Sequence, residues 1–329
     1  MRKKWDIVSI GEILIDFVSK EQNIALPDVT EYKRAAGGGP ANVAVGAARL
    51  GKKVGFIGKV GRDAFGRHLI QTLEQNGVDT EGVAVDSAAD TTLVFVALNQ
   101  AGIPDFSFFR HGTADTLLRA EELPIKMLQE TKVLHFSSVA LTTEPARSAC
   151  LKAVDIAREA GALISFDPNI RLPLWQAEQT ARDEILAAVA MTDILKMNDE
   201  EYMFLTGNAF SEHVQADESL WKERVKLLIV TRGDKGSVLF TRKETVSIAG
   251  FPVSVVDTTG AGDAFMAAIL TNLAGMSLQD SFHRSQLEGL GRWAGVAAAL
   301  ACQRIGGIPS LPDLAEVQRF MEREGVCTL

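Results

Sequence analysis

The sequence predicts an α/β protein with a mostly parallel sheet, helices on both faces of that sheet, and a small inserted β-sheet. From about residue 130 onward, short apolar runs alternate with helical patterns, which is typical of strands that are buried on both faces. Two earlier regions, residues 12–34 and 91–110, contain strand patterns without helices between them. The chain has no low-complexity linker and no internal repeat, so residues 1–329 are expected to form one functional unit.

The alternating part of the chain predicts strands and helices in turn. The strands are expected at Val133–Phe136, Leu163–Phe166, Asp193–Lys196 and Leu227–Val230. The helices are expected at Glu144–Ala160, at Glu178–Val189, from Gly262 to about Ala274, and from about Leu287 to Arg304. Pro145 suits a first helical turn and Gly161 suits a helix end, which supports the first of these helices.

The two helix-poor regions predict a small sheet whose parts are distant in sequence but adjacent in space. Thr91–Leu98 and Phe106–Phe109 read as strands, and the turn signal at Asn99–Gly102 between them predicts a hairpin. Such an insertion could form a lid, mainly from residues 12–34 and 91–110, over an α/β body built from the remainder.

Composition excludes several classes of protein. A formal net charge of −8 argues against nucleic-acid binding, which relies on clustered Lys and Arg. The three cysteines show neither zinc-ligand spacing nor a disulfide pattern. No apolar stretch approaches the ~18 residues of a membrane span, and the start lacks a signal-peptide core. We expect a cytoplasmic protein with no membrane partner.

The segment Asp257–Phe265 carries the strongest chemical signal. The all-round apolar run Met266–Leu273 predicts a buried helix that begins near Gly262, and the free N–H groups of that helix start attract anions. Gly260, Ala261 and Gly262 would let a phosphoryl group approach the backbone. Asp263 in the first turn could accept a proton from an attacking hydroxyl. The alternative is a capped helix start in which Asp263 only favours the helix dipole.

A second glycine-rich segment, Gly37–Gly51, offers groups that suit a polar ligand. Gly38 and Gly39 expose backbone amides, Asn42 can donate and accept hydrogen bonds, and Pro40 sits where a helix can begin. A tight connection without ligand is the alternative. Residues 46–52 formally match the start of a P-loop, but they follow a helical pattern and lack the following Ser or Thr, so we reject that motif.

Together, and in the expected order, these two segments resemble the two signatures of the ribokinase-like carbohydrate kinases, the PfkB family. The resemblance covers nearly the whole chain and implies a three-layer α/β/α fold and ATP-dependent phosphorylation of a sugar hydroxyl, with Asp263 as the base. Within the family the chain is most similar to fructokinases. That similarity rests on Gly11–Phe17, Gly58–Gly61 with Phe65–Gly66, Asp167–Trp175 and Gly306–Pro312.

The resemblance also implies roles for residues near the sugar and the phosphate. The residue matching Asp16 binds substrate hydroxyls in the family. Arg171 lies where a cation near the transferring phosphate would be useful, although a structural salt bridge is the alternative. The segment Phe109–Asp115 departs from the fructokinase pattern, because it carries His-Gly-Thr where Asn-Pro-Ser is usual. Arg110 in this segment could contact substrate, whereas His111 is expected at the surface or in packing.

Further resemblances imply a nucleotide site and two cation sites. Asn198 and Glu201 match a motif associated with Mg²⁺, held through water, although an ordinary helix N-cap explains them equally. Thr231, Gly233 and Gly236 resemble a nucleotide loop, with Lys196 at the end of the neighbouring strand as a further ATP contact; a simple hairpin turn is the alternative. Family members often bind a monovalent cation, which here implies a possible K⁺ site at Asp257, Thr259 and the loop at residues 304–306.

The expected reaction is transfer of a phosphoryl group from ATP to D-fructose, giving fructose 6-phosphate. The alternatives are 2-keto-3-deoxygluconate kinase, whose carboxylate substrate would demand a second cation, or another sugar kinase of the family. A sugar-binding regulator without catalysis is also kept. A homodimer through the lid is a family expectation, supported by unpaired strand edges and by the apolar residues Val94, Val96, Phe106 and Phe108.

Overall fold

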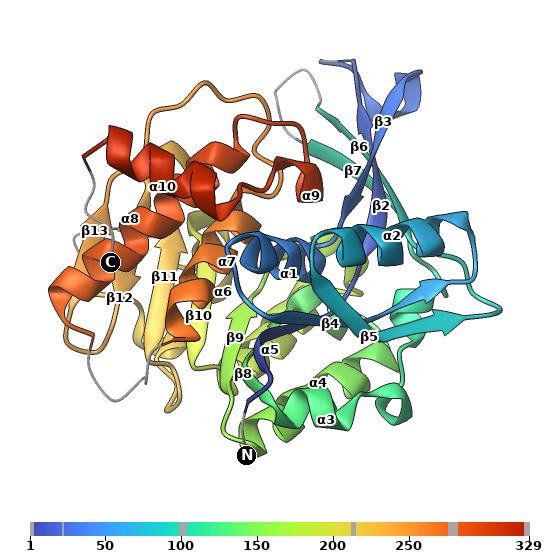
Figure 1. The fold of residues 1–329 in the computed structure, drawn as a ribbon, viewed down its shortest axis with the longest axis horizontal. Coiled ribbons are helices and arrows are strands. Elements are labelled where there is room, and N and C mark those ends of the chain that lie inside the picture. Colours follow the sequence, from blue (N-terminus) through green and yellow to red (C-terminus); the bar gives the residue numbers. More distant parts are fainter. Residues whose placement is uncertain (1–2, 22, 99–103, 212–214, 276–281, 326–329) are drawn as a thin grey trace.

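The computed structural model describes residues 3–21, 23–98, 104–211, 215–275 and 282–325, and within these residues the chain forms two sheets (Figure 1). The larger, nine-stranded sheet of these residues has the order β13-β12-β11-β10-β9-β8-β1-β4-β5. Its strands are β1 (Trp5–Ile10), β4 (Val54–Gly61), β5 (Val78–Asp86), β8 (Thr131–Ser137), β9 (Leu163–Asp167), β10 (Ile194–Asn198), β11 (Leu227–Thr231), β12 (Ser237–Phe240) and β13 (Thr245–Ile248). Each neighbouring pair of strands in the series β11-β10-β9-β8-β1-β4-β5 is parallel. At one edge, β12 pairs antiparallel with β11, and β13 pairs antiparallel with β12.

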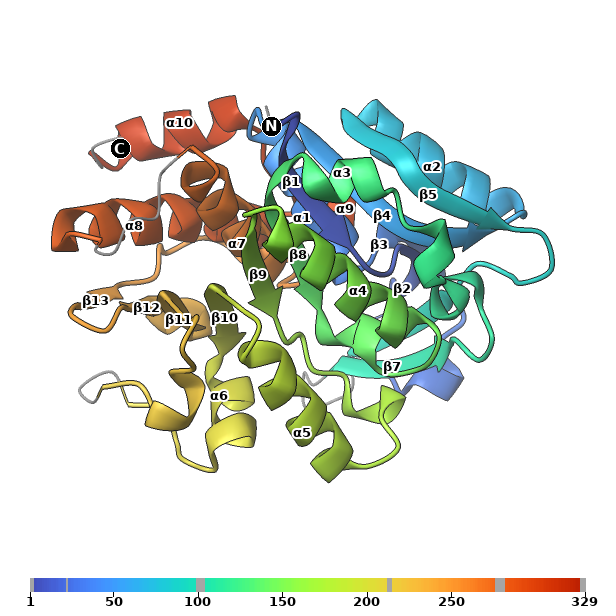
Figure 2. The ribbon, with the colours of Figure 1, turned by 90° about the horizontal axis from the view of Figure 1, so that it is seen from below.

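Helices cover both faces of the large sheet, because its central strands are apolar on both sides. In β11, Leu227 and Ile229 pack into one hydrophobic core, while Leu228 and Val230 pack into the other. The first core contains residues of α1 (Gly39–Arg49), α2 (Ala64–Gln75), α7 (Ala261–Leu273), α8 (Arg284–Ala301), α9 (Gly307–Ser310) and α10 (Leu314–Arg323). The second contains residues of α3 (Ile125–Gln129), α4 (Ala146–Glu159), α5 (Glu178–Val189) and α6 (Asp199–Thr206). Figure 2 shows the helices on either side of the sheet, and the predicted three-layer arrangement is confirmed.

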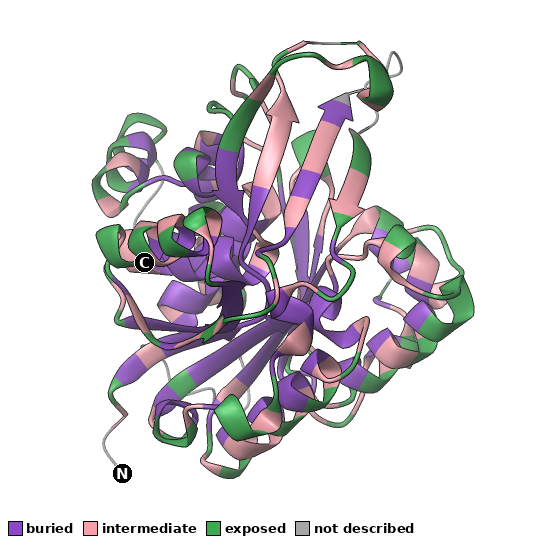
Figure 3. Ribbon diagram, turned by 90° about the vertical axis from the view of Figure 1, so that its right-hand side faces the viewer, coloured by how far each residue is buried: buried purple, intermediate pink, exposed green. Residues whose placement is uncertain are grey.

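The smaller sheet projects from the body, and its strands are less buried than those of the large sheet (Figure 3). Its order is β3-β2-β6-β7, and its strands are β2 (Leu14–Ser19), β3 (Tyr32–Gly37), β6 (Leu93–Leu98) and β7 (Pro104–Phe109). β2 and β6 pair in parallel, and β3 and β7 pair antiparallel to them on the outside. Both helix-poor regions therefore contribute strands to one sheet, as predicted. The predicted turn at Asn99–Gly102 lies outside the described residues. The strands before and after it, β6 and β7, pair antiparallel.

Most predicted elements are present, with small shifts at their ends. α5 has the predicted bounds, and Gly51 follows α1 with a φ of +87°, which is a helix stop rather than part of a P-loop. The last long helix begins and ends three residues earlier than predicted. Between residues 54 and 86 the chain forms β4, α2 and β5, which the sequence had left unassigned.

No helix of the described residues is long and apolar enough to cross a membrane. Cys150 is buried and Cys302 is partly exposed, and neither forms a disulfide; Cys327 lies outside the described residues.

Candidate active site

A cavity of about 530 Å³ lies between the small sheet and the carboxyl ends of the parallel strands of the large sheet. β9, β10 and β11 each contribute the residue at or near their carboxyl end, namely Asp167, Asn198 and Thr231. The starts of α1 and α7 and one face of the small sheet complete the wall. Open α/β sheets bind ligands at this edge.

The start of α7 brings the backbone of Gly260 and Gly262 to the cavity, whereas the Ala261 amide donates a hydrogen bond of 3.1 Å to the Thr258 carbonyl. Gly260 precedes the helix with a φ of +85°, a conformation that a residue with a side chain rarely adopts. At Gly262, an added Cβ would lie 2.9 Å from Lys196 Nζ, so the lysine ammonium lies directly against the helix start. The helix start and the ammonium together suit a phosphate group. Gly260 and Gly262 line the cavity, and Ala261 lies between them as the first residue of α7.

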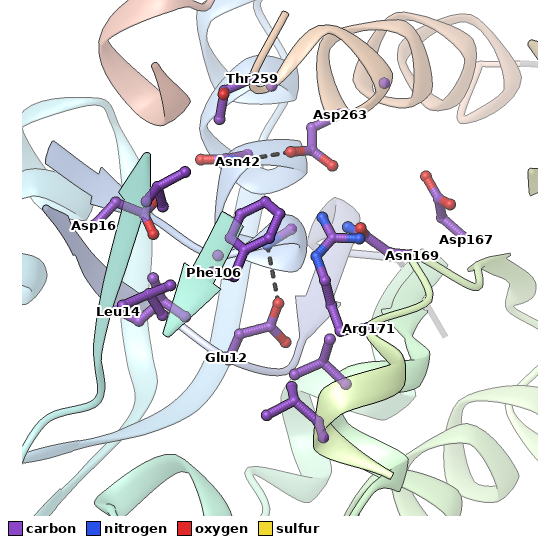
Figure 4. Close-up of a pocket in the computed structure, with 18 of the residues that line it drawn as sticks. Glu12, Leu14, Asp16, Asn42, Phe106, Asp167, Asn169, Arg171, Thr259 and Asp263 are labelled. Atoms are coloured by element: carbon purple, nitrogen blue, oxygen red, sulfur yellow. Dashed lines mark hydrogen bonds between the residues drawn. The ribbon is translucent and has the colours of Figure 1, made fainter. Parts of the chain in front are cut away.

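Asp263 lies in the first turn of α7, and its side chain is oriented by Asn42 from α1 (Figure 4). Asn42 Nδ2 donates a hydrogen bond of 2.8 Å to Asp263 Oδ2. Burial raises the pKa of Asp263 to about 6, opposed by the Asn42 hydrogen bond and by the positive charges of Lys196 and Arg171. A carboxylate with this pKa is largely ionised at neutral pH, yet it is basic enough to accept a proton.

Asp16 occupies the opposite wall, on the cavity face of β2. Burial raises the pKa of Asp16 to about 7, with Arg171 lowering it and Asp263 and Asp257 raising it further. Gly37 on the paired strand leaves the space that the carboxyl fills, because a Cβ on Gly37 would collide with Asp16 Oδ2. The two carboxylates Asp16 and Asp263 therefore face one space from opposite sides.

Arg171 reaches the cavity from the loop after β9. It donates a hydrogen bond of 3.0 Å to the Ile170 carbonyl, and its guanidinium carbon lies 5.6 Å from the ring centroid of Phe106. This contact links the body to the small sheet through a cation–π interaction. Arg171 makes no ion pair with any residue that the structure describes, so the structural salt bridge is wrong for the described part of the chain.

Lys196 forms a buried ion pair of 2.7 Å with Asp167 at the floor of the cavity. Burial alone would lower the pKa of Lys196, but the nearby Asp167, Glu201 and Asp263 carboxylates raise it above its ordinary value. The ammonium therefore remains charged beside Gly262, where a phosphate could approach.

Asn198 and Glu201 form a reciprocal helix cap at the start of α6. Asn198 Oδ1 accepts a hydrogen bond of 2.7 Å from the backbone N–H of Glu201, and Glu201 Oε2 accepts one of 2.9 Å from the backbone N–H of Asn198. Glu201 Oε1 also accepts from the Ile170 amide at 2.8 Å. The ordinary N-cap is thus present, but each carboxylate oxygen keeps a second acceptor position. Both residues line the cavity, so they fit contacts to a Mg²⁺ ion through water. No cluster of three metal-binding side chains occurs among the described residues.

The loop after β11 makes a turn into β12, so the hairpin is confirmed. Thr231 pairs with Ser237 and lines the cavity. Gly233, with a φ of +56°, has open space where a side chain would stand, and at Gly236 a Cβ would collide with the Ile248 carbonyl. Thr231 is placed to contact a ligand, whereas Gly233 and Gly236 shape the turn beyond the cavity wall.

Asp257 and Thr259 lie in the loop that leads into α7. The Thr259 amide donates a hydrogen bond of 2.9 Å to Asp257 Oδ1. Asp257 Oδ2 is buried and has no hydrogen-bond partner among the described residues, and it lies close to Gly306. An unpaired buried carboxylate oxygen in a loop suits a cation, so these residues fit the predicted monovalent site.

Arg110 has a structural role that the sequence did not reveal. Its Nε and the Asp115 carboxylate form an ion pair of 2.7 Å, and both side chains are almost fully buried. The same guanidinium donates to Thr142 Oγ1 at 2.7 Å and to the Val139 carbonyl at 3.2 Å. Arg110 still lines the cavity, but most of its donors are already used. His111 is exposed, as predicted.

Four apolar residues of the small sheet face the cavity: Val94, Val96, Phe106 and Phe108. Their position does not support the predicted use of these side chains in a homodimer contact, because alternation along β6 and β7 turns them toward the site. Gly38, Gly39, Asn42 and Asp16 also line the cavity. Most of the site residues that the sequence predicts therefore line one cavity.

Sequence reasoning missed several polar residues of the wall, among them Glu12, Asp167 and Asn169. Glu12 is buried, and its Oε1 accepts a hydrogen bond of 3.0 Å from the Gly39 amide. Asn169 has a φ of +46°, and its amide nitrogen lies against Gly39. Glu12 and Asn169 are inside segments that resemble fructokinases, and each lies two residues after an apolar strand, so a polar residue just beyond such a strand was the available signal.

Comparison with known proteins gives a consistent result over nearly the whole chain. Residues 4–314 match the pfkB family carbohydrate kinases. Fructokinase-1 of Zea mays is 42% identical over 321 residues, which is 96% of this chain and 98% of the maize protein.

Two solved structures have the same architecture. The fructokinase of Xylella fastidiosa, solved with bound ATP, is 31% identical with a TM-score of 0.86, covering 97% of this chain and 98% of that one. A double mutant of the Vibrio cholerae O395 fructokinase, solved with fructose, ADP and a potassium ion, is 32% identical with a TM-score of 0.84. That alignment covers 97% of this chain and 99% of the other.

Proposed function

Because the chain belongs to the pfkB family of carbohydrate kinases, we propose that it transfers the γ-phosphoryl group of ATP to the 6-hydroxyl of D-fructose. The observation that carries this proposal is the arrangement of Asp263, which Asn42 orients beside the anion-binding start of α7 and across the cavity from Asp16. This arrangement supplies a base, a phosphate site and a hydroxyl site within one space.

Asp263 accepts the proton of the attacking hydroxyl in this proposal. Its raised pKa suits a base that works near neutral pH, and general-base catalysis contributes about 10²–10⁴-fold to such reactions. The amides of Gly260, Ala261 and Gly262 stabilise charge on the phosphoryl group during transfer, with Arg171 approaching from the other side.

The sugar end of the cavity supports a neutral, hydroxyl-rich substrate. Asp16, Asn42 and the Gly38–Gly39 turn offer acceptors and donors for hydroxyl groups. Among the described residues, the cations of the wall are Arg110, Arg171 and Lys196, and the first and last are paired with buried carboxylates. A sugar acid would need a second free cation besides Arg171, which approaches the phosphoryl group, so this pairing favours fructose over 2-keto-3-deoxygluconate.

The nucleotide end would use Thr231 and Lys196, with Gly233 and Gly236 holding the loop in shape. Asn198 and Glu201 would hold Mg²⁺ through water, and Asp257 and Thr259 would hold K⁺. A bound Mg²⁺ neutralises charge on the phosphates of ATP during transfer.

The small sheet acts as a lid in this proposal, together with the loops within residues 12–34 and 91–110. Apart from Asp16, the side chains on its cavity face are apolar, and Phe106 covers Arg171, so closure would exclude water and limit ATP hydrolysis. We further propose that the chain acts in the cytoplasm as a homodimer through the outer face of this sheet.

The test is ADP release measured with fructose, ribose, 2-keto-3-deoxygluconate and a nucleoside as acceptors. We expect the highest kcat/KM with fructose and a strict requirement for a divalent ion. A higher kcat/KM with the sugar acid than with fructose would make the sugar acid the substrate. Sugar binding without ADP release in the presence of any of the acceptors would indicate a regulator.

A further inference from the structure

Glu12 is a buried carboxylate that the proposed reaction leaves without a role. It lies two residues after the end of β1, lines the cavity and is only 4% exposed. Its Oε1 accepts a hydrogen bond from the Gly39 amide, whereas its Oε2 is buried and has no hydrogen-bond partner among the residues that the structure describes. An unpaired oxygen on a buried carboxyl group is costly, and structures rarely keep one without a reason.

The surroundings of Glu12 fix its position on the sugar side of the cavity. Its own carbonyl packs against Gly38, where an added Cβ would lie 2.5 Å from that oxygen. Asn169 closes the other side of Gly39, where an added Cβ would lie 2.5 Å from the asparagine amide nitrogen. In Figure 4, the Glu12 carboxyl points toward the space between Asn169, Arg171 and Phe106.

No described cation neutralises this carboxyl by direct contact. Arg110 is near enough to lower the pKa of Glu12, but the Arg110 guanidinium is bonded to Asp115, Thr142 and Val139 instead. Burial is the larger effect and raises the pKa of Glu12 to about 7. The free oxygen therefore lacks a donor that a ligand with hydroxyl groups could supply.

We propose that Glu12 is a sugar-specificity residue: Oε1 holds the Gly38–Gly39 turn, and Oε2 accepts a hydrogen bond from a substrate hydroxyl that is not phosphorylated. This inference rests on the proposed sugar kinase activity and adds a recognition contact to it. It is distinct from Asp263, which lies across the cavity at the start of α7. A site built to bond a hydroxyl discriminates strongly against analogues that lack it.

The variant Glu12→Gln separates recognition from a purely structural role. The glutamine carbonyl can still accept from the Gly39 amide, so the turn and α1 are retained. Its amide nitrogen replaces the free acceptor with a donor, so a substrate hydroxyl loses the partner for its proton. We expect the KM for fructose to rise at least about tenfold, as for loss of one hydrogen bond to a charged group, with an unchanged KM for ATP.

Single-deoxy analogues of fructose give the decisive measurement. In the wild-type enzyme, removing the hydroxyl that contacts Glu12 should lower kcat/KM by at least about tenfold, but in Glu12→Gln the same removal should cost little. The other deoxy analogues should lose equal factors in both enzymes, because only contacting groups are coupled. The proposal is overturned if each analogue lowers kcat/KM by the same factor in the wild-type enzyme and in Glu12→Gln.

Two controls keep the outcome readable. Glu81 is an exposed glutamate, so Glu81→Gln reports what a charge change alone does. If Glu12→Gln does not fold, Glu12→Asp takes its place in the same analogue series, since the shorter carboxylate cannot reach both partners. If wild-type enzyme turns over another sugar instead of fructose, the fructose proposal fails, and the deoxy series of that sugar tests Glu12 in the same way.

Discussion

At the scale of single residues, the behaviour of Asp263 depends on its surroundings more than on its residue type. An aspartate in an exposed first turn would be a weak base, whereas burial raises the pKa of this one to about 6. Asn42, from a helix distant in sequence, fixes the direction of its carboxylate. The same first-turn position therefore suits both the helix dipole and the proposed base, and burial favours the role as a base.

Replacing the proposed base should stop phosphoryl transfer without unfolding the protein. Asp263→Asn keeps the shape and can still accept from Asn42, but it cannot take a proton. We expect kcat to fall about 10²–10⁴-fold while sugar binding and the melting temperature stay near those of the wild type. The check is ADP release together with calorimetric sugar binding, and a folded variant with near-normal kcat would remove Asp263 from the mechanism.

The pH dependence of the reaction should report the Asn42–Asp263 hydrogen bond. Asp263 must be ionised to act, so kcat/KM should fall as the pH drops through about 6. Asn42 stabilises the ionised form, so Asn42→Ala should raise the pKa of Asp263 and move this acidic limb to higher pH. Asp16 also titrates, with a pKa of about 7, so the shift between the two profiles is the diagnostic quantity. An unmoved limb in Asn42→Ala would contradict the assignment.

At the scale of elements, local sequence signals predicted those segments whose structure depends on local chemistry. α5 has its predicted bounds, and α7 begins within one residue of its predicted start, because glycine, the apolar run and the first-turn acid act within a few residues. The hydrogen bonds of Arg110 could not be predicted in this way. Its partners Val139 and Thr142 come from the segment after β8, and sequence spacing does not report that contact.

Arg110 and Asp115 anchor the end of β7 to the body, and their loss should destabilise the fold. Asp115 also accepts a hydrogen bond from Thr92, which directly precedes β6, so both inserted strands are held at one point. Arg110→Ala leaves a buried carboxylate unpaired, which typically costs about 3–5 kcal/mol of unfolding free energy. Urea unfolding of the variant measures this loss.

The matched control for Arg110 is an exposed ion pair in α8. Arg284 and Glu288 lie 3.3 Å apart at i,i+4 spacing on the surface, and Glu288→Gln should change stability by less than about 0.5 kcal/mol. If Arg110→Ala were as stable as this control and lost only affinity for sugar, then Arg110 would be a substrate contact, as the sequence suggested.

At the scale of the whole molecule, the sequence predicted two sheets, but it did not predict which face of the small sheet lies toward the cavity. Alternation along a strand separates two faces without indicating which one is inward, so the sequence alone also permits a dimer contact through the cavity-facing residues. The other face carries a cluster of aromatic residues with ring centroids 5.0 to 6.5 Å apart. The cluster consists of Phe17, Tyr32, Phe95 and Phe109 of the sheet, together with Phe65 of α2, whose ring contacts Phe17. We call it the outer aromatic cluster.

The outer aromatic cluster is the better candidate for contact between two copies of the chain. Phe109 is 59% exposed, although its ring packs edge-on against Phe95, and large aromatic rings left in water favour association. The outside strands β3 and β7 also have one unpaired edge each within the described sheet. A dimer built on this face would hold both lids by their outer surfaces and leave both cavities open to ligands.

Two substitutions on the same strand test this orientation. Phe109→Asp puts a charge on the outer face, and we expect it to shift a wild-type dimer to monomer in light scattering coupled to gel filtration. Phe106→Asp puts the same charge on the cavity face, three residues earlier, and should leave the dimer intact while disturbing Arg171. If the wild type is a monomer, or if only Phe106→Asp dissociates the dimer, the outer aromatic cluster is not the interface. The pair thus decides which face of one sheet serves association and which serves the substrate, because alternation places the two rings on opposite sides.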